Sequence, residues 1–189
     1  MSQEDEVVTA GYVAKELLSF ILYLAASLVC IYLLLTYVGQ RTVVNGSSME
    51  DTLSDQDNLI TDKWTYRHHN PKRYDVIVFP YQPGSDVYYI KRIMGLPGET
   101  VYIDADGTIY INEEPIYDPY GTETILNPGL ASQTIQLGPD EFFVLGDNRN
   151  NSTDSRFEVV GNVKKSEIIG KAWVRIYPFN KIGKVCNIK

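Results

Sequence analysis

The chain has 189 residues, 44% of them hydrophobic, and its 24 acidic and 17 basic side chains give a net charge of -7. This length supports one domain with a substantial core plus an extra element, and the negative charge argues against a nucleic-acid partner. Cys30 in an apolar run and Cys186 near the C-terminus are poorly placed to form a disulfide, so the cysteines do not assign a redox compartment.

The first predicted element is a transmembrane helix over residues 17–38. These 22 residues, LLSFILYLAASLVCIYLLLTYV, carry no charge, and about 20 apolar residues are enough to cross the hydrocarbon core of a bilayer. The acidic start MSQEDE and the lack of an Ala-x-Ala site favour a permanent anchor over a cleavable signal peptide. Residues 1–16 are then a short N-terminal tail. Lys15 before the helix and Arg41 after it leave the orientation open.

After the helix, the pattern is one of short strands separated by turns. Asp106-Gly107 predicts a hairpin within residues 100–112, because these residue types adopt the positive φ of a tight turn. Residues 113–133 contain three prolines and predict an irregular insertion. The expected fold is a mainly β domain over residues 39–189, behind a single N-terminal helix. Further strands are predicted within 74–80, 86–94, 134–147 (two strands, around Gly138-Pro139) and 170–179, the last as the final strand.

Several kinds of active site find little support. The only histidines, His68 and His69, are adjacent in WTYRHHNPKR, with no cluster of ligand residues around them, so a solvated loop is the simpler interpretation than a metal site or a Ser-His-Asp triad. No Gly-rich phosphate loop and no Ser-x-x-Lys motif is present. We therefore expect neither a metal nor an organic cofactor.

Serine and lysine remain as candidates for nucleophilic chemistry. Two serines follow Gly46 in the segment NGSSMEDTL, residues 45–53, and Lys91 lies in the apolar run VYYIKRIM. Burial among apolar neighbours lowers the pKa of a lysine, and a neutral amine can take the proton of a serine hydroxyl. The alternative is that Lys91 points outward from a half-exposed strand.

A third segment, LGDNRNNSTDSRFEVVG at residues 145–161, strengthens the catalytic interpretation. A polar turn alone would explain its asparagines but not two Asp–Arg pairs beside short hydroxyls. We expect Asp147 to pair with Arg149 and Asp154 with Arg156, which would stiffen the loop around Ser152.

Together, these three segments resemble the type I signal peptidases, membrane-anchored Ser-Lys endopeptidases that remove signal peptides from exported proteins. The boxes are SMEDT after the anchor, KRIMGLPGE, and GDNRNNSTDSR, in the family's order, and the resemblance covers residues 17–180. It implies a signal-peptidase-like antiparallel β domain, with Ser48 rather than Ser47 as nucleophile and Lys91 as general base. The resemblance also implies that Ser152 orients the lysine amine. It assigns further supporting roles around the dyad to Met49, Arg92, Asp147, Arg149, Asp154 and Arg156.

Asp51 departs from the family's pattern, and Gly46 stands at a position where members of the family differ. Asp51 stands where the family has a proline, which removes a restraint on φ and adds a carboxylate near the nucleophile. Some members carry, two residues before the nucleophile, a side-chain hydroxyl that assists the oxyanion hole; this chain has Gly46 at that position, as members from Gram-positive bacteria do. The hole would then rest chiefly on the backbone N–H of Ser48. We also expect Met49 and nearby apolar side chains to dip toward the lipid and so to help desolvate Lys91.

The resemblance also implies where the protein works. It would be a single-pass protein of the cell membrane, with a cytoplasmic N-terminus and an extracytoplasmic catalytic domain. Its partners would be preproteins that carry signal peptides, and the lipid bilayer. Three alternatives stay open at this point. One is a self-cleaving protease of the SOS-repressor kind, which the apolar run opposes. The others are an inactive membrane-anchored binding or assembly factor, which only Asp51 favours, and a specialised peptidase for pilin-like surface proteins.

Overall fold

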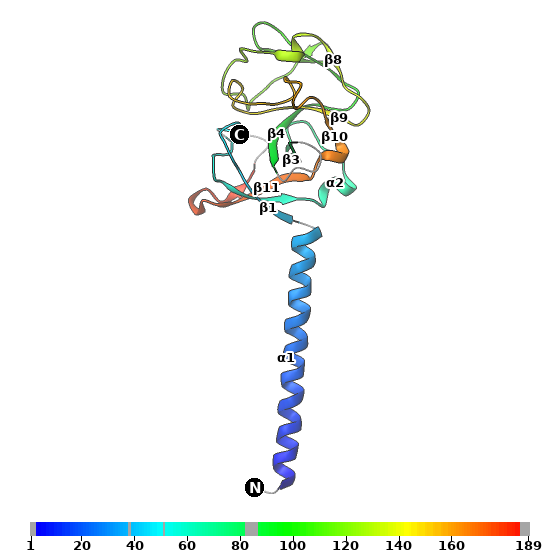
Figure 1. The fold of residues 1–189 in the computed structure, drawn as a ribbon, viewed down its shortest axis with the longest axis vertical. Coiled ribbons are helices and arrows are strands. Elements are labelled where there is room, and N and C mark those ends of the chain that lie inside the picture. The colour runs from blue at the N-terminus through cyan, green and yellow to red at the C-terminus, as the bar shows by residue number, and fades with distance from the viewer. Residues whose placement is uncertain (1–2, 38, 51, 82–86, 186–189) are drawn as a thin grey trace. The chain divides into compact units, whose positions relative to one another are not determined.

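The computed structural model describes residues 3–37, 39–50, 52–81 and 87–185. The chain divides into two compact units, residues 1–39 and residues 40–189. Figure 1 shows the first as one long helix and the second as a unit built of strands.

The first unit is helix α1, Gln3–Tyr37. Within it, the 22 residues Tyr12–Leu33 have a mean hydropathy of 2.1, which is long and apolar enough for a membrane span. The helix already begins at Gln3, so the residues that the sequence suggested as a separate tail are helical almost throughout. Val38, the last residue of the predicted span, lies outside the described residues.

The second unit is built around a sheet with the strand order β1-β2-β11-β3-β4-β9-β10, in which β12 also pairs with β11. The central strands of this sheet, from β2 to β9, pair with their neighbours in antiparallel fashion. The strands are β1 Gly39–Val43, β2 Asn58–Asp62, β3 Val76–Pro80, β4 Tyr88–Gly95, β9 Glu141–Leu145, β10 Val163–Lys164, β11 Gly170–Tyr177 and β12 Gly183–Lys184. Short helical turns connect some of them: α2 Thr65–His68, η2 Lys165–Glu167 and η3 Phe179–Lys181. A further turn, η1 Gly129–Ser132, lies in the long segment between β4 and β9.

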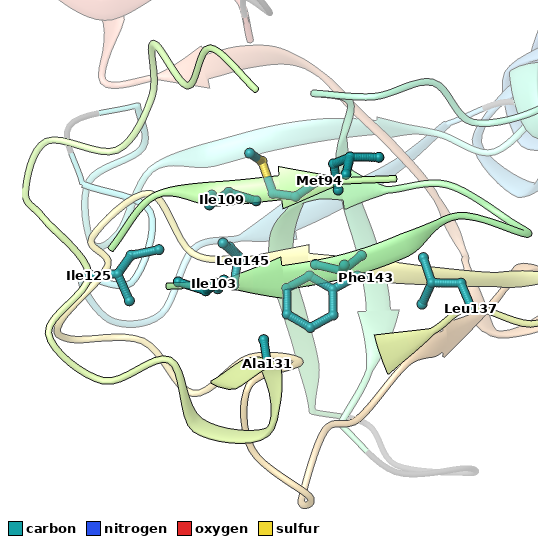
Figure 2. Close-up of a cluster of buried hydrophobic side chains, with 10 residues drawn as sticks. Met94, Ile103, Ile109, Ile125, Ala131, Leu137, Phe143 and Leu145 are labelled. Carbon is teal, nitrogen blue, oxygen red and sulfur yellow. The ribbon is translucent and has the colours of Figure 1, made fainter. Parts of the chain in front are cut away.

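A second, smaller sheet has the order β7-β6-β5-β8. Its strands are β5 Thr100–Ile103, β6 Ile109–Ile111, β7 Glu114–Pro115 and β8 Ile135–Gln136. Figure 2 shows how Ile103 and Ile109 of this sheet gather with Phe143 and Leu145 of β9 and with Met94 of β4. This shared apolar cluster packs the smaller sheet against β4 and β9.

Strand β4 is covered by apolar side chains on both faces. Ile90 belongs to one buried cluster, Ile93 to a second and Met94 to a third. Because successive side chains of a strand point to opposite faces, this covering allows two neighbouring charged residues of β4, Lys91 and Arg92, both to be buried.

The predicted hairpin is confirmed, with a longer turn than expected. Strands β5 and β6 pair from Val101–Ile111 to Ile103–Ile109, so the turn spans residues 104–108. Among the residues of this turn, only Gly107 has a positive φ, of 81°. The side chain of Asp104 accepts hydrogen bonds from the backbone N–H groups of Asp106 and Thr108 and so closes the turn. The predicted insertion 113–133 contains β7 and η1 and is otherwise irregular. The strand predicted within 170–179 exists as β11 but is not the last, because β12 follows it.

Candidate functional site

Ser48 and Lys91 lie in direct contact. The Nζ atom of Lys91 is 2.7 Å from the Oγ atom of Ser48 and 3.2 Å from the carbonyl oxygen of Ile90. Ser48 begins the turn after β1, and Lys91 lies in β4, 43 residues later. The fold therefore places a hydroxyl and an amine at the distance that proton transfer requires.

Lys91 does not point outward. Its residue is only 3% exposed, and burial lowers the pKa of its amine from 10.5 to about 8, although the negative charges of Asp154 and Asp147 act in the opposite direction. Half of the amine is then neutral near pH 8, whereas an exposed lysine would be almost fully protonated. The site can therefore supply a base close to neutral pH.

The dyad opens onto a cavity of about 310 Å³. On one side the cavity is lined by residues 44–49, and on the other by residues 88–91 of β4. In β4, residues 92–95 pair with β9, whereas β3 is the only described strand that pairs with residues 88–91. One backbone edge of β4 is therefore free of described strands at the level of the dyad, and such an edge can accept an extended peptide as an added strand.

Next to Lys91, Arg92 forms a buried ion pair with Asp147. Its Nε and Nη2 atoms lie 2.8 and 2.6 Å from the two carboxylate oxygens, and neither side chain is exposed. Thr52 donates its hydroxyl to the same carboxylate at 2.6 Å, and the guanidinium carbon of Arg92 lies 3.6 Å from the ring centre of Tyr120. Four segments distant in sequence, which contribute Thr52, Arg92, Tyr120 and Asp147, are thereby joined next to the residues of the dyad.

The expected pairing within residues 145–161 is half correct. Asp154 pairs with Arg156 at 2.8 Å, as predicted. Asp147 does not pair with Arg149, because it faces the guanidinium of Arg92 instead. The partner of Arg149 is Asp118, at 2.5 Å, which lies in the insertion.

The described contacts of Ser152 do not include Lys91. Its hydroxyl is buried with no hydrogen-bond partner among the described residues. It nevertheless lies close to Ser48, since a Cβ placed on Gly146 would meet Ser152 Oγ at 2.2 Å and the carbonyl oxygen of Ser48 at 2.5 Å. Only a residue without a side chain fits between the two serines.

Two expectations about residues next to Ser48 have different outcomes. The expected contact of Met49 with lipid is wrong, because Met49 is 1% exposed and packs with Leu53 and Leu59 in a core cluster of the domain itself. The desolvation of Lys91 therefore arises inside the protein. Asp51, which replaces the proline of the box, lies outside the described residues.

The histidines are far from forming a metal centre. His68 and His69 are exposed in and after α2. In the part of the chain that the structure describes, no group of three or more His, Cys, Asp or Glu side chains could hold a metal ion.

Sequence reasoning missed three residues of the site: Thr52, Asp118 and Asn148. Thr52 stands in the first box and could have been paired with the third by its hydroxyl. Asn148 donates its backbone N–H to the carbonyl oxygen of Ser48 and its side-chain amide to that of Ser47, both at 3.1 Å. Asp118 gave no signal, because its partner is set by how the insertion folds back on the loop.

Known proteins match this chain over most of its length. A sequence model of the family described as signal peptidase, peptidase S26, matches residues 16–177. Signal peptidase I of Leptolyngbya laminosa is 39% identical over 162 residues, which cover 79% of this chain and 74% of that protein. Signal peptidase I S of Bacillus subtilis is 32% identical over 178 residues, or 90% of this chain and 94% of that protein.

A crystal structure of a signal peptidase I from Enterococcus faecalis is 35% identical and aligns with 55% of this chain and 97% of its own, at a TM-score of 0.45. The residues matched by the family model, 16–177, include the turn at Ser48, strand β4 with Lys91 and the loop of residues 145–161. The chain therefore belongs to the signal peptidase family, peptidase S26, and is a serine endopeptidase of the signal peptidase I kind.

Proposed function

We propose that Ser48 is the nucleophile and Lys91 the general base of this signal peptidase. The observation that carries the proposal is the 2.7 Å contact between Lys91 Nζ and Ser48 Oγ, made by a lysine that is almost fully buried. Burial holds part of the amine neutral near pH 8, and a neutral amine in contact with a hydroxyl is the geometry of a serine–lysine dyad.

The reaction is an acyl transfer in two steps. Lys91 takes the proton of Ser48 while Oγ bonds to the substrate carbonyl carbon, and the electron pair of the carbonyl moves to its oxygen. The carbonyl then re-forms, the C–N bond to the mature protein breaks, and the charged amine of Lys91 gives its proton to the leaving nitrogen, so that an ester to Ser48 remains. Water, deprotonated by the same lysine, hydrolyses this ester and frees the enzyme.

The developing oxyanion requires a donor beside Ser48. Gly46 offers no side chain, so the backbone N–H of Ser48 is the donor, and a single donor of this kind typically contributes about 3–4 kcal/mol. Among the described residues this N–H makes no other hydrogen bond, which supports the assignment.

Family membership makes preproteins with signal peptides the substrate class. We propose that the cleavage region binds as an extended strand along the free edge of β4 at residues 88–91, within the cavity beside Ser48. The family prefers small residues at positions -1 and -3, and we propose the same preference here.

The remaining site residues support the dyad. Arg92, Asp147, Arg149, Asp154 and Arg156 hold the loop around it through the buried pairs described above. Ser152 lies in the same region, and we propose that its free hydroxyl orients the lysine amine when substrate is bound.

The apolar helix makes the protein a membrane-anchored enzyme. We propose residues 17–38 as the span, with residues 1–16 on the cytoplasmic side and the catalytic domain, 39–189, on the outer side of the cell membrane. Preproteins emerge on that outer side, so this orientation brings substrate and site together.

The experiment is cleavage of a preprotein carrying an Ala-x-Ala site by the detergent-solubilised full chain, with Ser48→Ala as the inactive control. We expect the wild type to cut after the second alanine, as determined by mass spectrometry of both products. Replacing either alanine of the site with leucine is expected to reduce cleavage about tenfold or more, since pocket discrimination against extra methylenes is typically about 1–3 kcal/mol. Cleavage elsewhere, or an active Ser48→Ala chain, would refute the proposal.

A further inference from the structure

We infer that Asn148 is a positioning residue that fixes the direction of the oxyanion donor, the backbone N–H of Ser48. The inference rests on the proposed function, because it concerns the same acyl-transfer step. It assigns a role to a side chain that neither the dyad nor the ion pairs explain.

Asn148 makes two hydrogen bonds to the nucleophile turn. Its side-chain amide donates to the carbonyl oxygen of Ser47 and its backbone N–H donates to the carbonyl oxygen of Ser48, each at 3.1 Å. These contacts join residues 100 or more positions apart, so they depend on the tertiary fold. Within the turn, the N–H of Glu50 also donates to Ser47, at 3.1 Å.

The bond to the Ser47 carbonyl controls the oxyanion donor through peptide geometry. The C=O of Ser47 and the N–H of Ser48 belong to one planar trans peptide unit, so they point in opposite directions. A donor that fixes the Ser47 carbonyl toward Asn148 therefore also fixes the Ser48 N–H, which points in the opposite direction. Gly46, Ser47 and Ser48 line the cavity, whereas Asn148 is not among its described lining residues, as this arrangement requires.

Rigid surroundings make Asn148 an effective anchor. The preceding residue, Asp147, is locked to Arg92 in the buried ion pair, and the N–H of Gly146 donates to Asp154 at 3.1 Å. The position of Asn148 is thus set by buried charges. Asn148 in turn fixes the orientation of the peptide unit between Ser47 and Ser48. Donation to the carbonyl also polarises the peptide and strengthens its N–H as a donor, since linked hydrogen bonds reinforce one another.

Asn148→Leu and Asn148→Ala test the role of the amide. Leucine roughly keeps the volume and loses the donor, whereas alanine loses both. If the donor matters, both variants lose about 10- to 100-fold in kcat with KM changed by less than about twofold, somewhat less than the effect of deleting an oxyanion donor outright. The matched control is Asn150→Ala in the same loop, whose amide bonds Glu123 and Thr124 of the insertion instead, and which is expected to stay within about twofold of wild type.

A second readout isolates the oxyanion from folding and substrate binding. A short peptide aldehyde ending in alaninal is attacked by Ser48: Oγ bonds to the aldehyde carbon, the carbonyl electron pair moves to its oxygen in the hole, and the Oγ proton passes to Lys91. The matching peptide alcohol has no carbonyl to attack. We expect Asn148→Leu to weaken aldehyde binding by about the same factor as kcat, and to leave alcohol binding unchanged.

The outcomes separate the possible roles. If Asn148→Leu retains kcat but Asn148→Ala does not, Asn148 acts by packing. If the binding of the aldehyde and that of the alcohol weaken equally, the substitution disturbs the site in general. Either result overturns the inference and leaves the proposed dyad standing. A wild-type chain that does not bind the aldehyde, or a Ser48→Ala chain that still cleaves preprotein, refutes the proposed nucleophile, and the inference falls with it.

Discussion

Lys91→Met is expected to abolish cleavage while the protein stays folded. Methionine is about as long and as apolar as the buried part of lysine, but it cannot take the proton of Ser48. Removing one member of such a nucleophile–base unit typically lowers kcat by about four to six orders of magnitude. The measurement is single-turnover cleavage of a preprotein, with thermal unfolding followed in parallel.

Stability distinguishes this result from simple misfolding. Because burial lowers the pKa of Lys91 from 10.5 to about 8, the unfolded chain binds one more proton than the folded chain between these pH values. The contribution of Lys91 to the free energy of unfolding of the wild type should therefore rise with pH from about 8 to 10.5. Lys91→Met should unfold at the same temperature or higher near neutral pH and should lack this contribution. A variant that unfolds well below the wild type would instead assign Lys91 a structural role.

Asp147→Asn is expected to destabilise the domain by about 3–5 kcal/mol, the typical cost of leaving a buried charge without its partner. Arg92 would keep its charge with no exposure to water, having lost the carboxylate that contacts its Nε and Nη2 atoms. The measurement is the midpoint of urea unfolding of the detergent-solubilised chain. Glu123→Gln makes the same chemical change at an exposed carboxylate and should shift stability by less than about 0.5 kcal/mol.

A double variant tests whether the cost comes from the unpaired charge. Arg92→Met together with Asp147→Leu removes both charges, and apolar replacement of a buried pair is often close to neutral. The double variant should therefore be more stable than Asp147→Asn alone. If it is less stable, the hydrogen bonds of Thr52 and of the Tyr74 carbonyl to this pair outweigh the charge.

The sequence predicts the dyad through three short segments that together resemble the type I signal peptidases. A lysine among apolar and aromatic residues on a strand can only be buried or turned outward, and the structure shows it buried. Alternating residues around Asp106-Gly107 likewise predict the hairpin, because the side-chain period of a strand is local. The ion pair of Asp154 with Arg156 could be expected because the two residues are neighbours in the chain.

Contacts between distant segments could not be predicted in this way. Asp147 lies two residues from Arg149, yet it pairs with Arg92 across 55 residues, because the register of β4 against β9 brings Arg92 to the end of β9. The partner of Arg149 lies in the irregular insertion, where no periodic pattern constrains the chain. Met49 follows Ser48 and suggested a lipid contact, but packing within the domain buries it.

The pH dependence of kcat/KM tests the central claim most directly, because it reports the pKa of the base in the free enzyme. With Lys91 as the base, kcat/KM for a preprotein should rise about tenfold per pH unit on the acid side and level off above a pKa of about 8. A rate that is flat between pH 6 and pH 9, or one that still climbs toward the pKa of an exposed lysine, about 10.4, would contradict a buried neutral lysine as the base.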